Sequence, residues 1–108
     1  MNCEDFKKRI QTYSREDIVI TNHAWEQSVF RNISLDEVRK NILNPKRLQI
    51  VLEQPSKRAS EEKFDCYFGY SKTQCHRYIL VLKKKCVVCT VIKINRRWQK
   101  RFEKHVKV

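Results

Sequence analysis

Apolar residues recur at helical spacing near the start of the chain and then give way to a β-branched run. Phe6, Ile10 and Tyr13 follow one another at intervals of three or four residues, so residues 3–14 are predicted to form a short amphipathic helix. Residues 17–21, DIVIT, are rich in β-branched side chains and are predicted to form a strand. The chain is therefore expected to begin with a helix and a strand.

Two further helices are predicted from capping residues and apolar spacing. Asn22 can cap a second helix, and Asn32 is expected to end it because asparagine tolerates the left-handed conformation found just beyond helix ends. Ser34 and Glu37 have the spacing of a capping box, which predicts a third helix that stops at the Asn-Pro pair 44–45. The side chains predicted to face the core are Trp25, Val29, Phe30 and Ile33 in the second helix and Leu35, Val38 and Ile42 in the third.

Four strand-like runs follow, at residues 47–53, 62–70, 76–83 and 86–94. Alternation predicts one apolar face in each of the first two runs, made by Leu48, Ile50 and Leu52 and by Phe64, Cys66 and Phe68. The last two runs are apolar on both faces, as central strands are. The three lysines between them, residues 83–85, predict a hairpin connection.

Asn95 is predicted to cap a last helix, residues 96–106, with Trp98, Phe102 and Val106 facing the core. The expected order is α-β-α-α-β-β-β-β-α. At 108 residues, the chain is long enough for one core, so residues 1–108 are expected to form a single domain. The fold class is predicted as α+β, a mainly antiparallel twisted sheet of four to five strands packed by helices.

Positive charge is concentrated in the last third of the chain. The net charge is +12; residues 1–74 hold 13 Lys and Arg against 11 Asp and Glu, whereas residues 75–108 hold 11 against Glu103 alone. This asymmetry favours a polyanionic partner, because cations that meet phosphates release condensed counterions. A solvated basic surface without a partner is the alternative. The candidate nucleic-acid-binding residues are Lys83, Lys84, Lys85, Arg96, Arg97, Lys100 and Arg101.

The sequence predicts a cytoplasmic protein with no membrane partner. No apolar run approaches the ~20 residues of a membrane span, and the first ten residues lack the apolar core of a signal peptide. Five cysteines, an odd number, favour free thiols over a disulfide framework.

No metal or cofactor is predicted. Cys86 and Cys89 form a C-x-x-C, but residues three apart on a strand point to opposite faces and cannot easily share an ion. Cys66, Cys75 and His76 lack a fourth ligand, and their spacing matches no common zinc module. Buried thiols that fill the core are the simpler interpretation.

His23 is the candidate general base. At the first position of the second helix, the positive end of the helix dipole disfavours the imidazolium, so a neutral ring could accept a proton near pH 7. A histidine bonded to a neighbouring backbone group is the alternative. Arg31 falls on the same side two turns further on, and Lys93 lies in the last strand. Arg77 interrupts an apolar strand face and needs a partner, for which a phosphate or a carboxylate would serve equally well.

The stretch from His23 to Val38 resembles a family of small domains of unassigned function whose signature reads roughly H-A-x-x-R-x-x-x-R-G-I-S. The matching residues are His23, Ala24, Arg31, Ile33 and Ser34. Gln27 stands where an arginine is usual, and Asn32 replaces the glycine. The strands that follow are also similar, so the resemblance covers residues 17–94.

That family is similar to the RelE/ParE toxin superfamily, which implies a compact α+β fold. Members of this superfamily cleave mRNA, often on the ribosome, or poison DNA gyrase, and antitoxins bind in the same cleft. The resemblance implies His23 and Arg31 as site residues. No complete catalytic set carries over, because the cleaving members use varied residues.

Three functions remain open. The first is a toxin-like, metal-independent ribonuclease acting on mRNA or ribosome-associated RNA, with an antitoxin as a further partner. His23 would accept the 2′-OH proton or orient the substrate, and Arg31, Arg77 and Lys93 would clamp the scissile phosphate. The second is a non-catalytic basic module for nucleic acid or an acidic protein. In it, bases could stack on some of the aromatic residues Tyr67, Tyr70, Tyr78 and Trp98. The third is an interaction protein whose basic surface only keeps it in solution.

Overall fold

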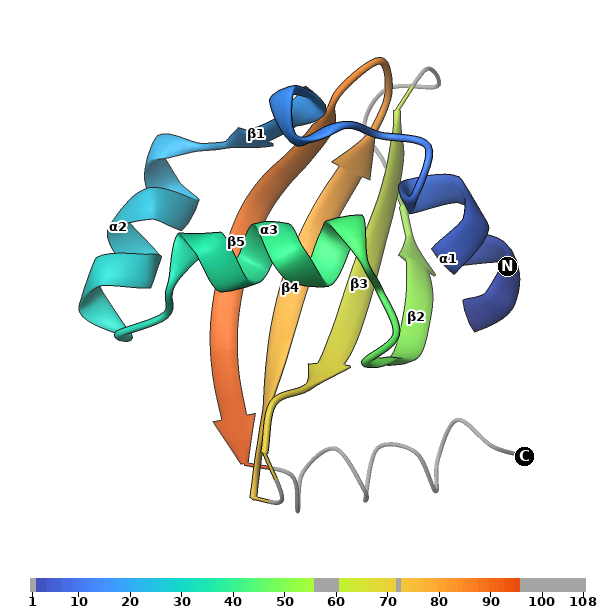
Figure 1. Ribbon diagram of the computed structural model, residues 1–108. Coiled ribbons are helices and arrows are strands. Elements are labelled where there is room, and N and C mark those ends of the chain that lie inside the picture. The colour runs from blue at the N-terminus through green and yellow to red at the C-terminus, as the bar shows by residue number, and fades with distance from the viewer. Residues whose placement is uncertain (1, 56–60, 72, 96–108) are drawn as a thin grey trace.

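The computed structural model describes residues 2–55, 61–71 and 73–95 (Figure 1). Its α-helices and strands are α1 (Cys3–Ile10), β1 (Ile18–Ile20), α2 (Asn22–Phe30), α3 (Leu35–Leu43), β2 (Leu48–Gln54), β3 (Glu62–Gly69), β4 (Gln74–Leu82) and β5 (Cys86–Asn95). A short 3-10 helix, Arg15–Asp17, lies between α1 and β1. The α+β class is confirmed. The predicted last helix, residues 96–106, lies outside the described residues.

The sheet is mixed and has five strands in the order β1-β5-β4-β3-β2. Strands β2 to β5 pair antiparallel with their sequence neighbours, whereas β1 runs parallel to β5 with Ile18 opposite Cys86. Helix α3 crosses one face of the sheet, α2 lies beside β5, and α1 lies beside β2 (Figure 1). Among the described residues, no helix has both the length and the apolar character needed to cross a membrane.

Helix α1 is confirmed but ends four residues earlier than predicted. Asn2 caps it by accepting the Asp5 backbone N–H at 2.9 Å, and Phe6 and Ile10 are buried. Tyr13 follows the helix, and its hydroxyl donates to the Lys83 carbonyl at 2.6 Å. The N-terminal segment is thereby tied to the β4–β5 turn.

The start of α2 differs by one residue from the prediction. Thr21, not Asn22, is the capping residue, because its Oγ1 accepts the Ala24 backbone N–H at 3.1 Å. Asn22 becomes the first helical residue, and His23 the second. Thr21 also donates its backbone N–H to the Val88 carbonyl at 3.1 Å, which couples the helix start to β5.

The apolar side chains of α2 point outward, so the predicted core face was wrong. Trp25 is 56% exposed, Val29 65% and Phe30 93%. The buried residues of α2 are Ala24 and Ser28, which are small enough for the helix backbone to lie close to β5. Packing with small side chains therefore overrides the apolar stripe. Ile33, just beyond the helix, is buried as predicted.

The turn between α2 and α3 is confirmed as predicted. Asn32 has a positive φ of 53°, and the Ile33 N–H donates to the Ser28 carbonyl at 2.8 Å, the hydrogen-bond pattern of a Schellman motif. Ser34 then caps α3 by accepting the Glu37 N–H at 3.4 Å. The predicted inner face of α3 is also correct, with Val38 and Ile42 fully buried.

The core lies between the helices and one sheet face. Phe64, Cys66 and Phe68 of β3 share this face, as predicted. The prediction for β2 was wrong for Leu48, because a register shift between Leu48 and Ile50 places Leu48 in this core, whereas Ile50 and Leu52 share a second, smaller cluster. A bulge inserts one residue and reverses which face the following side chains occupy.

The β4–β5 hairpin at residues 83–85 is confirmed, and the Lys83 N–H donates to the Lys85 carbonyl at 3.1 Å. Strand β5 also contains a register shift. Thr90 pairs with Ile79 and Val88 pairs with Leu80, so Cys89 has no partner across the strand. This bulge lies just beyond the point where pairing with β1 ends.

Candidate functional site

His23 is exposed in the first turn of α2. It makes no hydrogen bond or ion pair to another residue in the described part of the chain. The predicted alternative, a histidine bonded to a neighbouring backbone group, therefore finds no support there. The side chain is exposed beside the helix start.

Gln27 and Arg31 hold the edge of β5 at Val91. The Val91 N–H donates to Gln27 Oε1 at 3.0 Å, and Arg31 Nη1 donates to the Val91 carbonyl at 2.9 Å. Strand β1 pairs only with residues 86–88, so these two side chains substitute for a strand where the ladder has ended. Arginine, the residue usual at position 27 in the resembled family, has no acceptor and could not take the place of Gln27 here.

Lys93 has a structural contact of its own. Its Nζ donates to the Asn32 carbonyl at 3.2 Å and lies 5.4 Å from the centre of the Tyr70 ring. The lysine thus links β5 to the left-handed turn between α2 and α3. This contact leaves two of its three ammonium hydrogens for other acceptors.

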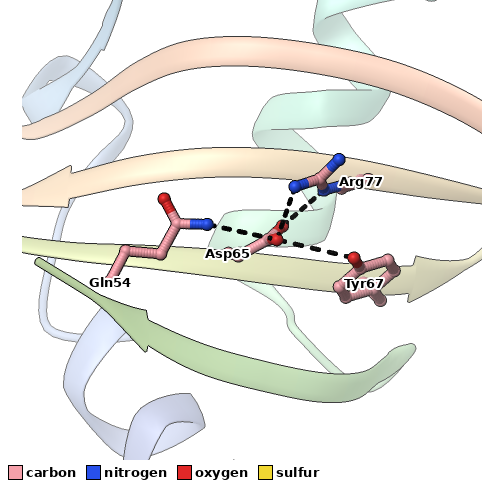
Figure 2. Close-up of polar contacts among 4 residues, drawn as sticks. All are labelled: Gln54, Asp65, Tyr67 and Arg77. Carbon is pink, nitrogen blue, oxygen red and sulfur yellow. Dashed lines mark hydrogen bonds and ion pairs between the residues drawn. The ribbon is translucent and has the colours of Figure 1, made fainter. Parts of the chain in front are cut away.

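Arg77 is paired with a carboxylate inside the protein. Its Nε and Nη2 donate to the two oxygens of Asp65, both at 2.7 Å (Figure 2). Asp65 is only 3% exposed and also accepts from Gln54 at 3.3 Å and from the Tyr67 hydroxyl at 3.4 Å. A carboxylate is therefore a partner of Arg77, and its hydrogen bonds raise the pKa of Arg77.

The four predicted catalytic residues do not form one site. Asp65 and Arg77 alternate along their strands with Cys66 and Tyr78, which belong to the core, so the ion pair lies on the opposite face of the sheet. The predicted base His23 and the other two cations belong to α2 and the adjoining edge of β5. A single phosphate could not meet all four side chains.

The predicted nucleic-acid-binding lysines lie at one end of the sheet. Lys83 is 3.3 Å from Glu61, and Lys85 is 3.1 Å from Asp17. Strand β5 carries the chain from this turn to Asn95 at the other end, roughly 30 Å away for ten residues (Figure 1). Arg96, Arg97, Lys100 and Arg101 lie outside the described residues.

A buried polar network was missed by sequence reasoning. Asn41 Nδ2 donates to the Tyr78 hydroxyl at 2.9 Å, and this hydroxyl lies 2.8 Å from His76 Nδ1. The His76 ring is stacked on Tyr70 at 4.4 Å between centroids. Burial, assisted by the charges of Lys93 and Arg47, lowers the pKa of His76 to about 4, so the ring is neutral at pH 7. The spacing of Asn41 from Val38 within the buried stripe of α3 was the available signal.

A groove of about 550 Å³ opens beside this network, and Asn41 belongs to both. The residues that line it are Ser34, Asp36, Glu37, Lys40, Asn41, Leu43, Asn44, Lys46 and Arg47. Its two carboxylates already have basic partners, because Asp36 lies 3.1 Å from Arg15 and Glu37 lies 4.0 Å from Arg47. Within the described ranges, Lys40 and Lys46 have no carboxylate within 4.0 Å. The groove therefore presents positive charge.

The cysteines are placed as small core residues. Cys66 and Cys75 belong to different apolar clusters, and burial raises the pKa of Cys86 to about 12. Cys89 is half-buried at the β5 bulge, where its thiol donates to the Val87 carbonyl at 3.9 Å. Across residues 2–55, 61–71 and 73–95, no three His, Cys, Asp or Glu side chains are grouped to hold a metal ion.

The stability of the fold is expected to fall as the pH drops from about 6.5 towards 4. His76 titrates near pH 4 when folded and near 6.5 when unfolded, so between these values the unfolded chain binds more protons and protonation favours unfolding. Urea denaturation at about pH 7 and about pH 5.5 tests this. His76 should contribute a slope of at most about 1.4 kcal/mol per pH unit to the free energy of unfolding. His76→Phe should lose this part of the slope, whereas His23→Phe should keep it. Equal slopes in both variants would contradict the assignment.

The chain matches no family model, no curated protein and no solved structure. The resemblance of residues 17–94 to the RelE/ParE superfamily therefore stays a prediction. The features that bear on function are the distribution of charge, the groove beside α3 and the exposed side of α2.

Proposed function

We propose that the protein is a non-catalytic module that binds nucleic acid through its positive charge. The observation that carries this proposal is the excess of Lys and Arg over Asp and Glu. The described residues hold 15 Lys and Arg against 11 Asp and Glu, and the remaining residues add nine against Glu103. Phosphates of a nucleic acid would compensate this charge and release counterions on binding.

The groove beside α3 is the proposed phosphate contact within the described fold. Lys40 and Lys46 line it together with Asn41 and Asn44, whose amides can donate or accept further hydrogen bonds. Arg47 adds a guanidinium that is half exposed and 4.0 Å from Glu37. Phosphate oxygens accept hydrogen bonds from all of these groups.

The arrangement of the predicted catalytic residues favours binding over cleavage. Metal-independent RNA cleavage needs a base at the 2′-OH and cations at the same phosphate. Arg77 is paired with Asp65 on the sheet face away from the core. His23, by contrast, is exposed on α2, the helix that lies beside β5. Binding requires no such convergence, because separate cations can each meet a different phosphate along the strand.

Removing the two unpaired lysines of the groove is expected to weaken nucleic-acid binding about tenfold at low salt, since each loses a phosphate contact. The double variant Lys40→Gln, Lys46→Gln is compared with Lys8→Gln, Lys63→Gln, which removes the same charge outside the groove. Affinity is measured by fluorescence anisotropy with a labelled oligouridine of about 15 nucleotides. If both double variants lose affinity equally, the groove is not the contact. If the wild type binds no RNA and no DNA at low salt, the proposed function is wrong.

A further inference from the structure

The exposed side of α2 is an apolar surface that folding does not explain. We call Trp25, Val29 and Phe30 the α2 aromatic face; all three are more than half exposed. The helix is held on the sheet by its other side, through Ala24 and Ser28. The large rings therefore contribute little to the core, and exposed aromatic groups of this kind mark interaction sites.

The α2 aromatic face is presented in a fixed position. Thr21 caps the start of the helix, and the Schellman motif around Asn32 fixes its end. Between these points, Gln27 and Arg31 bind both backbone groups of Val91. A partner would meet rings on a helix anchored at three places, so little ordering would be needed on binding.

Two cations lie next to the C-terminal end of this face. Arg31 directly follows Phe30 in the chain, and Lys93 reaches the Asn32 carbonyl two residues further on. Each uses one donor for that backbone contact and keeps others. Among the described residues, neither has a carboxylate within 4.0 Å. Glu26 is the acidic residue of α2 itself, so the local charge balance is positive.

We propose that the α2 aromatic face binds the unpaired bases of single-stranded nucleic acid. Bases stack on Trp25 and Phe30, and the adjoining phosphates meet Arg31 and Lys93. This inference rests on the proposed function and specifies its ligand. Any unpaired base offers a flat face for stacking, whereas the bases of a duplex are already stacked on one another. Aromatic rings beside cations without acidic partners favour this ligand over a second copy of the chain, which also carries a charge of +12.

The test compares two variants that keep the helix apolar. Trp25→Leu, Phe30→Leu removes both rings, and Val19→Leu changes an exposed apolar residue of β1 that lies outside the α2 aromatic face. Anisotropy titrations use labelled oligouridine, oligothymidine and an RNA duplex of about 15 nucleotides or base pairs. The double variant should bind both single strands at least about tenfold more weakly than wild type, and bind the duplex unchanged. Val19→Leu should match wild type throughout.

Four outcomes would overturn the inference. Equal losses for single strands and duplex would show that the rings do not contact unpaired bases. If the double variant binds all three probes as wild type does, and its affinity falls steeply with salt, the inference is wrong but the proposed function still stands. Wild-type dimerisation in sedimentation experiments that is lost in the double variant would make the face an interface between copies. A wild type that binds none of the three probes would reject the proposed function as well.

Discussion

Arg77→Met is expected to lower the free energy of unfolding by about 3 kcal/mol, because it strands a buried carboxylate. Asp65 is 3% exposed, and the guanidinium contacts both of its oxygens at 2.7 Å. The contacts from Gln54 and Tyr67 are longer, at 3.3 and 3.4 Å, and carry no charge. They cannot replace the guanidinium, so the chain must bury an unpaired charge or take up a proton.

Urea denaturation measures this effect against a matched arginine. Arg39→Met removes an arginine that lies 3.6 Å from Asp36, a carboxylate that is 71% exposed. This variant should lower the free energy of unfolding by less than about 1 kcal/mol. Adding Asp65→Asn to Arg77→Met removes the stranded charge and should recover much of the stability. If Arg77→Met is as stable as Arg39→Met, the ion pair between Arg77 and Asp65 does not stabilise the fold. Arg77 would then again be a candidate phosphate ligand.

The affinity for single-stranded RNA is expected to fall about 100-fold between about 50 and about 200 mM salt. Roughly five phosphate contacts would give a slope near −3.5 in a plot of log K against log salt. The source of these contacts is the charge of +12, which the carboxylates of the chain do not balance. Anisotropy titrations of labelled oligouridine at several salt concentrations give the slope.

The groove variant provides the control for this slope. Lys40→Gln, Lys46→Gln should make it shallower by about 1.4, the value for two lost contacts with a single strand. A slope that stays unchanged would place the contacts elsewhere in the chain. A nearly flat salt response of the wild type would mean that phosphate contacts do not drive binding, whatever the affinity.

Local signals in the sequence were sufficient to predict the elements. Ser34 and Asn32 mark helix boundaries through short-range hydrogen bonds and backbone preference, so both are visible in a few residues. The β-branched and apolar runs likewise predict β2 to β5. The bulge after Leu48 has no such signal, because it depends on how β2 aligns with β3.

The orientation of α2 could not be read from its own residues. Trp25, Val29 and Phe30 have the spacing of a core-facing stripe, and only the fit of the helix against β5 decides that Ala24 and Ser28 turn inward. Tertiary contact outweighs apolar spacing here, because small residues let the backbones approach.

The candidate site shows the same limit. The need of Arg77 for a partner was visible in the sequence, but Asp65 was not, since Arg77 pairs across the strands with Tyr67 and Asp65 lies diagonally. Asn41 was hidden for a similar reason, because its partner Tyr78 is 37 residues away. Side chains that meet across the fold carry no local pattern. The charge asymmetry was visible, because it depends on composition alone.

The length of RNA recovered from its complex with the protein tests binding without cleavage most directly. End-labelled RNA is incubated with wild type and with His23→Ala in the presence of a chelator, and the retarded band is analysed on a denaturing gel. We predict full-length RNA from both complexes. Shortened RNA from the wild-type complex, with full-length RNA from His23→Ala, would contradict the proposal and establish the protein as a ribonuclease that depends on His23.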